Sequence, residues 1–173
     1  MTRLLPYLLW TAFACVAGAQ EPAYAVRAWA ALEDRDWSPA ALRLREAEAT
    51  RWTYLEGPGF LAAGRSLRQL DQAAREVEAV RTYFARELGL AVSDRRAVIL
   101  LVGDGASWAD LIQRTGLRAD GEALQSGREI FVLATNACPP GRVAHELVDF
   151  LFRPQAGPGL PLWLDEGLAL RWS

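Results

Sequence analysis

The stretch from Arg142 to Phe152, RVAHELVDFLF, carries the strongest indication of the fold. It predicts a helix with apolar residues on nearly every side, and such a helix is normally buried. His145, Glu146 and Asp149 are polar side chains in this apolar setting, where a charge without a partner is costly. Residues four apart share a helix face, so His145 and Asp149 point the same way, with Glu146 beside them. The stretch therefore predicts a buried helix that presents a small polar site.

A second apolar stretch with an acidic pair follows after a short turn. The segment from Pro161 to Trp172 reads PLWLDEGLALRW, and its only acids are Asp165 and Glu166. Prolines and glycines between the two stretches indicate the turn. Two apolar helices that each carry a small acidic group can close over one cation. A catalytic metal site needs three protein ligands and one open position, and Glu166 is the candidate third ligand beside His145.

Together the two motifs resemble the gluzincin branch of the zincin metallopeptidases, and in particular the bacterial peptidase MA-like group. Members of this group carry a His-Glu-x-x-His helix and, after a short turn, a Trp-x-x-Glu-Gly-x-Ala helix. The resemblance covers residues 95–173. It implies that His145, Asp149 and Glu166 hold Zn²⁺, that Glu146 is the general base, and that the substrate is a peptide or protein.

Asp149 is the departure from this family, because it stands where the motif has its second histidine. An aspartate can ligate zinc, but its shorter side chain requires the two helices to lie closer together. A second carboxylate also cancels the positive charge of the metal unit, so the ion is a weaker Lewis acid. Oxygen ligands favour harder ions such as Mn²⁺, Mg²⁺ or Ca²⁺. Two hypotheses stay open: a metallopeptidase with a degenerate motif, and a zincin scaffold without catalysis.

Peptide hydrolysis also needs a hydrogen-bond donor for the developing oxyanion. The resemblance implies that a Tyr or His beyond the glutamate helix supplies it, and neither residue follows Glu166. The chain ends at Ser173, within a pattern that predicts a continuing helix. We therefore expect a zincin-like domain that is truncated at its C-terminal end, with an inert gene fragment as a further alternative.

Residues 1–19 have the pattern of a secretory signal peptide. Arg3 supplies a positive start, an apolar run follows, and Ala17-Gly18-Ala19 fits a cleavage site. We expect an exported protein, periplasmic or extracellular, without a stable membrane span after cleavage; an uncleaved N-terminal anchor is the alternative. Cleavage leaves Cys138 as the only cysteine, which excludes an internal disulfide. A small buried thiol is the favoured role for it, against a metal ligand or an intermolecular bridge.

The charge pattern argues against a nucleic-acid partner. All nineteen basic residues are Arg, and the formal net charge is −2. The arginines are scattered along the chain and form no basic stripe, so the sequence predicts no general attraction to nucleic acid.

The order of the predicted elements gives an α+β domain. Its expected parts are a small mixed sheet, a long backing helix, the active-site helix and the glutamate helix. Residues 65–173 are expected to form this zincin-like domain, and residues 20–64 an N-terminal lead with a helix and a hairpin. Ser38 and Pro39 are a favourable cap and first residue for a helix that runs to residue 49.

Further along, local patterns predict the remaining elements. Strands are expected over residues 51–56 and 60–63, around the turn Gly57-Pro58-Gly59. The long helix spans 66–88, and its charged residues are assigned to a solvated face. A strand buried on both faces spans 95–102, and Ser107 is expected to cap a short helix after it. Residues 129–134 predict another strand, which by the resemblance is the edge strand over the active cleft.

Overall fold

The computed structural model describes residues 24–27, 37–48, 50–92, 96–116, 121–156, 167 and 169–171. Within these ranges the chain forms six strands and four helices, which confirms the predicted α+β class. The strands are β1 (Ala25–Arg27), β2 (Thr53–Gly57), β3 (Phe60–Gly64), β4 (Ala97–Val102), β5 (Ala123–Ser126) and β6 (Glu129–Leu133). The helices are α1 (Pro39–Glu48), α2 (Leu67–Arg86), α3 (Gly105–Thr115) and α4 (Arg142–Ala156). None of these described helices is both long and apolar enough to cross a membrane.

The strands form one sheet in the order β1-β2-β3-β4-β6-β5. The central strands β3, β4 and β6 run parallel. The pairs β1–β2, β2–β3 and β5–β6 are antiparallel. The sheet is therefore mixed, as predicted, and the β2–β3 hairpin lies in the same sheet as the strands that follow residue 65.

The strand over residues 129–134, which the sequence predicts at the sheet edge, is an interior strand. β6 pairs with β4 on one side and with β5 on the other, so β5 forms this edge. β5 has no counterpart among the predicted elements. It is short, and only Ala123 and Leu124 are buried, so it lacks the alternation that marks a half-buried strand. Pairing with a distant segment, rather than local pattern, places it.

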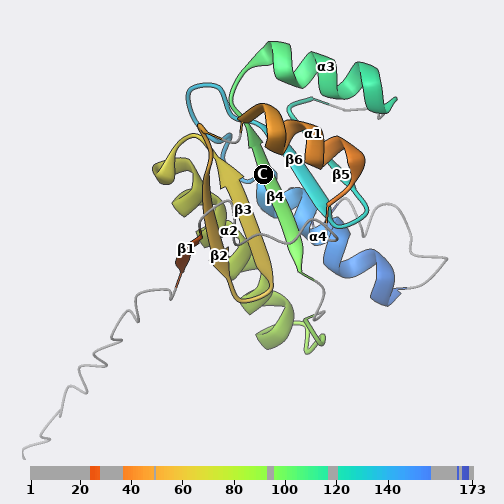
Figure 1. The fold of residues 1–173 in the computed structure, drawn as a ribbon. Coiled ribbons are helices and arrows are strands. Elements are labelled where there is room, and N and C mark those ends of the chain that lie inside the picture. Colours follow the sequence, from red (N-terminus) through yellow and green to blue (C-terminus); the bar gives the residue numbers. More distant parts are fainter. Residues whose placement is uncertain are drawn as a thin grey trace, which may run out of the picture.

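Helices cover both faces of the sheet (Figure 1). α2 and α4 lie on the face to which Ile99 and Leu101 of β4 point. α1 and α3 lie on the opposite face, with Val98 and Leu100. Successive side chains of a strand point to opposite faces, and a parallel strand that is covered on both faces is apolar throughout. All six residues of β4 are accordingly buried, which confirms the prediction for this strand.

Local capping sets where three of the helices begin, and for α2 the cap is Ser66, whose hydroxyl accepts the Gln69 N–H. The Ser38 hydroxyl accepts the Ala41 N–H at 3.1 Å, which confirms the predicted start of α1. α3 starts earlier than predicted, because its N-cap is Asp104 rather than Ser107. Oδ1 of Asp104 accepts the backbone N–H of Ser107 at 2.8 Å. An aspartate at this position also places a negative charge at the positive end of the helix.

Arg65, which precedes α2, connects α1 with α3. Its Nε donates to Oε2 of Glu48 at 2.8 Å, and its Nη2 donates to Oδ2 of Asp104 at 2.9 Å. Glu48 is buried, so the guanidinium compensates a charge that is costly to bury alone. The hydrogen bond to Glu48 raises the pKa of Arg65. The pKa of Asp104 is lowered, first by the backbone N–H of Ser107 and further by Arg65.

Candidate functional site

α4 carries three of the four predicted site residues, and it is a buried helix as predicted. Its core-facing residues pack against α2 and the sheet and are almost completely buried: Val143, Ala144, Leu147, Val148 and Leu151. His145, Glu146 and Asp149 are half-buried. The helix therefore holds its polar residues at the boundary of the core, where a side chain is positioned by packing and still partly reachable.

The helix is regular through the motif. The N–H of His145 donates to the carbonyl of Gly141 at 2.8 Å, which is an i to i−4 bond at the first turn. His145 and Asp149 therefore lie one turn apart on the same face, and Glu146 is about 100° round the helix from His145. An imidazole and a carboxylate in this relation can approach one common ion.

Asp149 forms an ion pair with Arg153 one turn later. Nη2 of Arg153 lies 2.9 Å from Oδ2 of Asp149, and the Asp149 side chain is only 13% exposed. Asp149 is therefore largely buried rather than solvent-facing. Sequence reasoning missed Arg153, although an acid followed four residues later by a base is a recognised helix pair. The carboxylate that replaces the second histidine thus has a cationic partner from its own helix.

Glu166, the candidate third ligand, lies outside the described residues, as do Asp165 and residues 1–19. The described residues that follow Glu166 belong to the same layer as α4. Gly167, Ala169 and Leu170 have helical backbone, and Ala169 is fully buried in the core cluster that contains the apolar side of α4. Arg171 lies over the ring of Tyr83 on α2, 4.6 Å from its centroid. Ala169 therefore lies in the core cluster that α2 and α4 share, and Arg171 contacts α2.

Within the described ranges, no three His, Cys, Asp or Glu side chains gather closely enough to hold a metal ion. The predicted metal ligands include Glu166, which lies outside the described residues. The described residues therefore contain only two of the three predicted ligands. His145 and Asp149 supply one nitrogen and one carboxylate from a single helix face. A donor set of this kind fits Zn²⁺ and harder divalent ions once a third ligand joins it.

Glu76 of α2 is a site neighbour that the sequence does not reveal. Its Oε1 accepts the N–H of Gly141 at 3.1 Å, and its Oε2 accepts the N–H of Ala144 at 3.2 Å. The assignment of all charged residues of α2 to a solvated face is therefore wrong for Glu76. No local signal predicts this contact, because the partners come from two helices that are far apart in the sequence.

Cys138, just before α4, is a buried thiol as expected, with 1% of its surface exposed. Burial raises its pKa to about 12, and the nearby negative charge of Glu76 adds to the effect. A thiolate is the form that binds metal and attacks electrophiles. Cys138 therefore stays protonated at neutral pH and acts as a small apolar residue beneath the start of α4.

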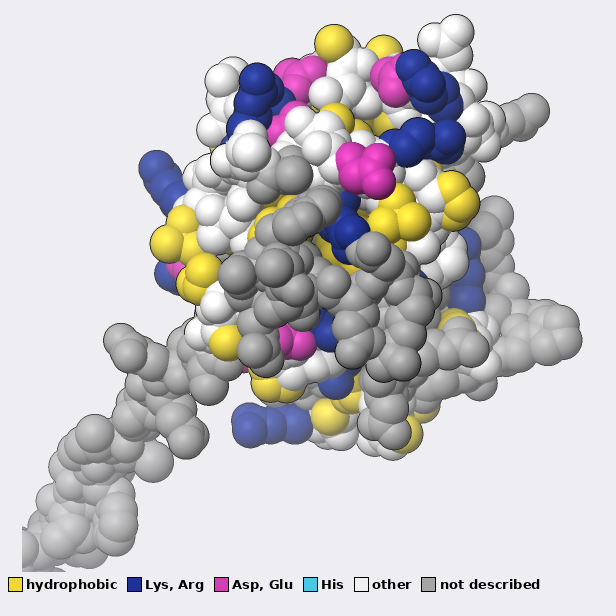
Figure 2. All heavy atoms as spheres, in the orientation of Figure 1, with side chains coloured by type: hydrophobic (Ala, Val, Ile, Leu, Met, Phe, Trp, Pro, Cys, Tyr) yellow, Lys and Arg dark blue, Asp and Glu magenta, His cyan; other side chains and the backbone are white. Residues whose placement is uncertain are grey.

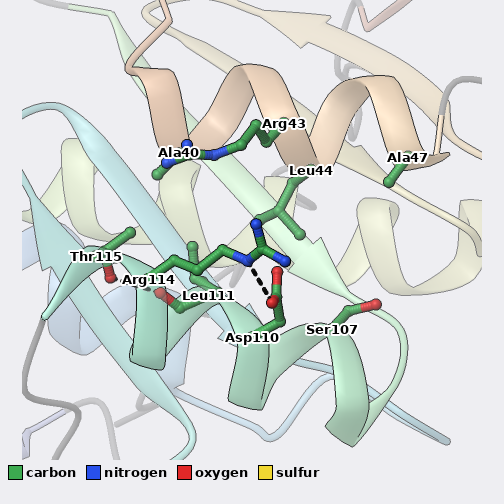
Figure 3. Close-up of a pocket in the computed structure, with 9 residues that line it drawn as sticks. All are labelled: Ala40, Arg43, Leu44, Ala47, Ser107, Asp110, Leu111, Arg114 and Thr115. Atoms are coloured by element: carbon green, nitrogen blue, oxygen red, sulfur yellow. Dashed lines mark hydrogen bonds and ion pairs between the residues drawn. The ribbon is translucent and has the colours of Figure 1, made fainter.

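A groove between α1 and α3 lies on the opposite face of the sheet from α4 (Figure 3). Leu44 and Leu111 line its floor, and an Arg114–Asp110 ion pair lies beside them. Its volume is about 90 Å³, well below the roughly 300 Å³ at which small-molecule pockets begin. The groove is therefore separate from the candidate site and too small for a peptide.

The molecular face in Figure 2 carries basic and acidic side chains interspersed in its upper part, with apolar groups between them. A nucleic-acid surface instead gathers basic residues into a continuous patch. The face shown therefore offers mixed charge rather than a basic field.

Comparisons with protein families, with curated proteins and with solved structures found no match for this chain. The resemblance to zincins therefore depends on the two sequence motifs alone.

Proposed function

We propose that the protein is an exported, zincin-like metallopeptidase with a degenerate motif. His145, Asp149 and Glu166 are its proposed metal ligands, and Glu146 is its proposed general base. The main support is the shared layer of the two motifs. α4 presents His145 and Asp149 on one face, and the residues just after Glu166 pack into the same core cluster. Glu166 precedes Ala169 by three residues, so in the helix that the sequence predicts over residues 161–172 the two would share one face.

The edge of the sheet supports a peptide substrate. On the resemblance to zincins, an edge strand beside the active-site helix pairs with an extended substrate. We assign this role to β5, because it is the edge strand on the side of α4, it is antiparallel to its neighbour, and it contacts α4. We therefore propose that residues 123–126, rather than residues 129–134, pair with the substrate. An extended peptide can add to such an edge through backbone hydrogen bonds.

The proposed chemistry is metal-assisted hydrolysis of a peptide bond. A bound divalent ion would supply Lewis acidity and a water of lowered pKa. Glu146 would take a proton from the attacking water and return it to the leaving amine. His145, Asp149 and Glu166 would hold the ion. Two carboxylates among three ligands predict a lower rate than a His-His-Glu site gives, because the extra negative charge weakens the Lewis acid.

The decisive experiment measures bound metal and peptide cleavage on the same purified protein. We expect one divalent ion per chain by elemental analysis, and casein cleavage that a chelator abolishes. Glu146→Gln should keep the ion and lose cleavage, whereas Glu46→Gln, exposed on α1, should change neither. Protein without a bound ion after dialysis against Zn²⁺ and Mn²⁺ would contradict the proposal.

The Asp149–Arg153 ion pair favours a second candidate, a zincin scaffold that has lost catalysis and serves in binding. The guanidinium already compensates the carboxylate that stands in the ligand position. Asp149→His distinguishes the two candidates. If the natural chain is inactive and Asp149→His gains zinc binding and peptide cleavage, the natural chain is a degenerate enzyme. An unchanged, metal-free variant excludes a metal site in either form.

Export is part of the same proposal and has its own test. The signal-peptide pattern of residues 1–19 predicts that the mature protein starts at Gln20. N-terminal sequencing of protein from the periplasm or medium of an expressing bacterium checks this. An intact N-terminus on membrane-bound protein would favour the uncleaved anchor.

A further inference from the structure

α4 begins at a residue that cannot cap it. The bond from the His145 N–H to the Gly141 carbonyl makes Gly141 the cap position. Gly141 has no side chain, and its φ of 74° lies in the left-handed region that favours glycine. The first N–H groups of a helix have no partner within the helix, and they need an acceptor when they are buried.

Glu76 supplies this acceptor from α2. Its two carboxylate oxygens receive the N–H of Gly141 and the N–H of Ala144. These are the cap residue and the third residue of the helix, the positions that a capping box within one helix would satisfy. Its negative charge also lies at the positive end of the α4 dipole. Ala144 directly precedes His145, so this bond fixes the backbone one residue before the candidate ligand.

Two glutamines of α2 extend the same contact. Nε2 of Gln72 donates to Oε1 of Glu76 at 3.2 Å and to the carbonyl of Cys138 at 3.1 Å. Nε2 of Gln69 donates to the carbonyl of Ala134 at 3.2 Å. One face of α2 therefore holds the backbone from the end of β6 to the first turn of α4.

Apolar packing alone does not set the position of α4. The buried residues of α4 determine which face turns to the core, but the hydrophobic effect has no preferred direction. Hydrogen bonds are directional, so the pair of bonds to Glu76 sets the position of α4 along its own axis. Ligand groups tolerate an error of about 0.5 Å, so a small slide of α4 is enough to misplace His145.

We propose that Glu76 is a positioning residue for the candidate site. It locks the first turn of α4 and thereby sets the place of His145 and Glu146. Its consequence for metal binding rests on the proposed function above, whereas its effect on the position of His145 does not.

The test compares Glu76→Ala and Glu76→Gln with Glu87→Gln in the full chain. Glutamine keeps one acceptor oxygen and can serve only one of the two N–H groups. Glu87, exposed at the end of α2, provides the same loss of charge away from α4. His145 is the only histidine, so its imidazole Hε1 proton gives one assignable NMR signal in metal-free protein.

We expect Glu76→Ala to shift or split the His145 signal and to weaken Zn²⁺ binding by about tenfold or more, as loss of an outer-sphere ligand partner does. Glu76→Gln should fall between Glu76→Ala and the natural chain, and Glu87→Gln should match the natural chain. If Glu76→Ala does not fold, the comparison of Glu76→Gln with Glu87→Gln carries the test.

A lowered melting temperature with an unmoved His145 signal and unchanged Zn²⁺ affinity would overturn the inference and leave Glu76 as an ordinary cap. A natural chain without Zn²⁺ binding would instead remove the proposed function. The His145 signal would then still decide whether Glu76 positions the helix.

Discussion

At the scale of single residues, Asp149 is the position on which the function depends. The sequence shows an acid in the place of a second histidine, and the structure adds a cationic partner, Arg153, at 2.9 Å. An acid that precedes a base by four residues is the favourable orientation for a helix pair, and Arg153 also lies near the negative C-terminal end of α4. Its charge would therefore compete with a metal ion for the same carboxylate in the proposed site.

Arg153→Gln should raise the affinity for Mn²⁺ or Zn²⁺ by roughly two- to fivefold, the worth of a half-exposed helix ion pair. The cause is that Asp149 no longer shares its charge with a guanidinium. Isothermal titration of metal into both proteins measures the change. Arg114→Gln is the matched control, because it breaks an i,i+4 pair with Asp110 on α3. Equal affinities for the natural chain and both variants would show that Asp149 does not ligate the ion.

Cys138 should be almost inert in the folded protein. Its pKa of about 12 lies well above the roughly 8.5 of a free thiol, so the thiolate is scarce at pH 8 and the sulfur is also covered. In a Cys15→Ser chain, we expect a disulfide reagent to react at least about tenfold more slowly in buffer than in urea. Equal rates would mean that the start of α4 opens readily in the folded state.

At the scale of elements, the starts of the helices follow two different rules. Ser38 and Asp104 cap α1 and α3 from the adjacent residues of the chain, and a local rule therefore predicts that helices begin there. α4 receives its cap from α2 through Glu76. α3 is also tied to α1 through Arg65, so its cap residue has a second partner.

Asp104→Asn should change how stability depends on acid. The folded-state pKa of Asp104 is lowered, so its carboxylate contributes stability above the unfolded pKa of about 3.9. This contribution is lost as pH falls through the lower folded-state pKa. Urea unfolding at several pH values should show a natural chain that is more stable than Asp104→Asn at pH 6, with the difference shrinking below pH 4.

Asp110→Asn removes the same charge at an exposed position of α3 and serves as the control. A difference between the natural chain and Asp104→Asn that stayed constant down to pH 2 would contradict the assigned ionic role of Asp104. Asparagine is itself a good cap residue, so the variant tests the charge more than the hydrogen bond.

At the scale of the whole molecule, a mixed sheet with helices on both faces produces two core clusters. The parallel strands β3, β4 and β6 are buried on both sides and apolar apart from Glu129 of β6, so each face of the sheet has its own core. The cluster shared by α2 and α4 also includes Ala169. Ala169, three residues after Glu166, is therefore part of the core, and this placement is compatible with the proposed convergence of the two motifs.

Ala169→Asp should lower the free energy of unfolding by about 3 kcal/mol or more, because it buries a carboxylate among apolar groups. Leu170→Asp, next to it but 62% exposed, should change stability by no more than about 0.5 kcal/mol. Denaturant unfolding of both variants measures the contrast. Two equally small effects would show that residues 169–171 are not a fixed part of this layer.

Local pattern is enough to predict much of this molecule. The long helix α2, the buried strand β4, the β2–β3 hairpin and the helix with His145, Glu146 and Asp149 all follow from apolar spacing and turn residues. These signals act over a few neighbouring residues, so they are visible without a fold. The Asp149–Arg153 pair belongs to this group too, since its spacing of four is written in the chain.

Tertiary structure alone decides the rest. β5 becomes the sheet edge and β6 an interior strand because strand order depends on pairing between distant segments. Glu76 becomes the cap of α4 although it lies 68 residues from Ala144, and Ala169 joins the core beneath α4. No local preference encodes such contacts, because they gain their free energy only when elements far apart in the chain are packed together.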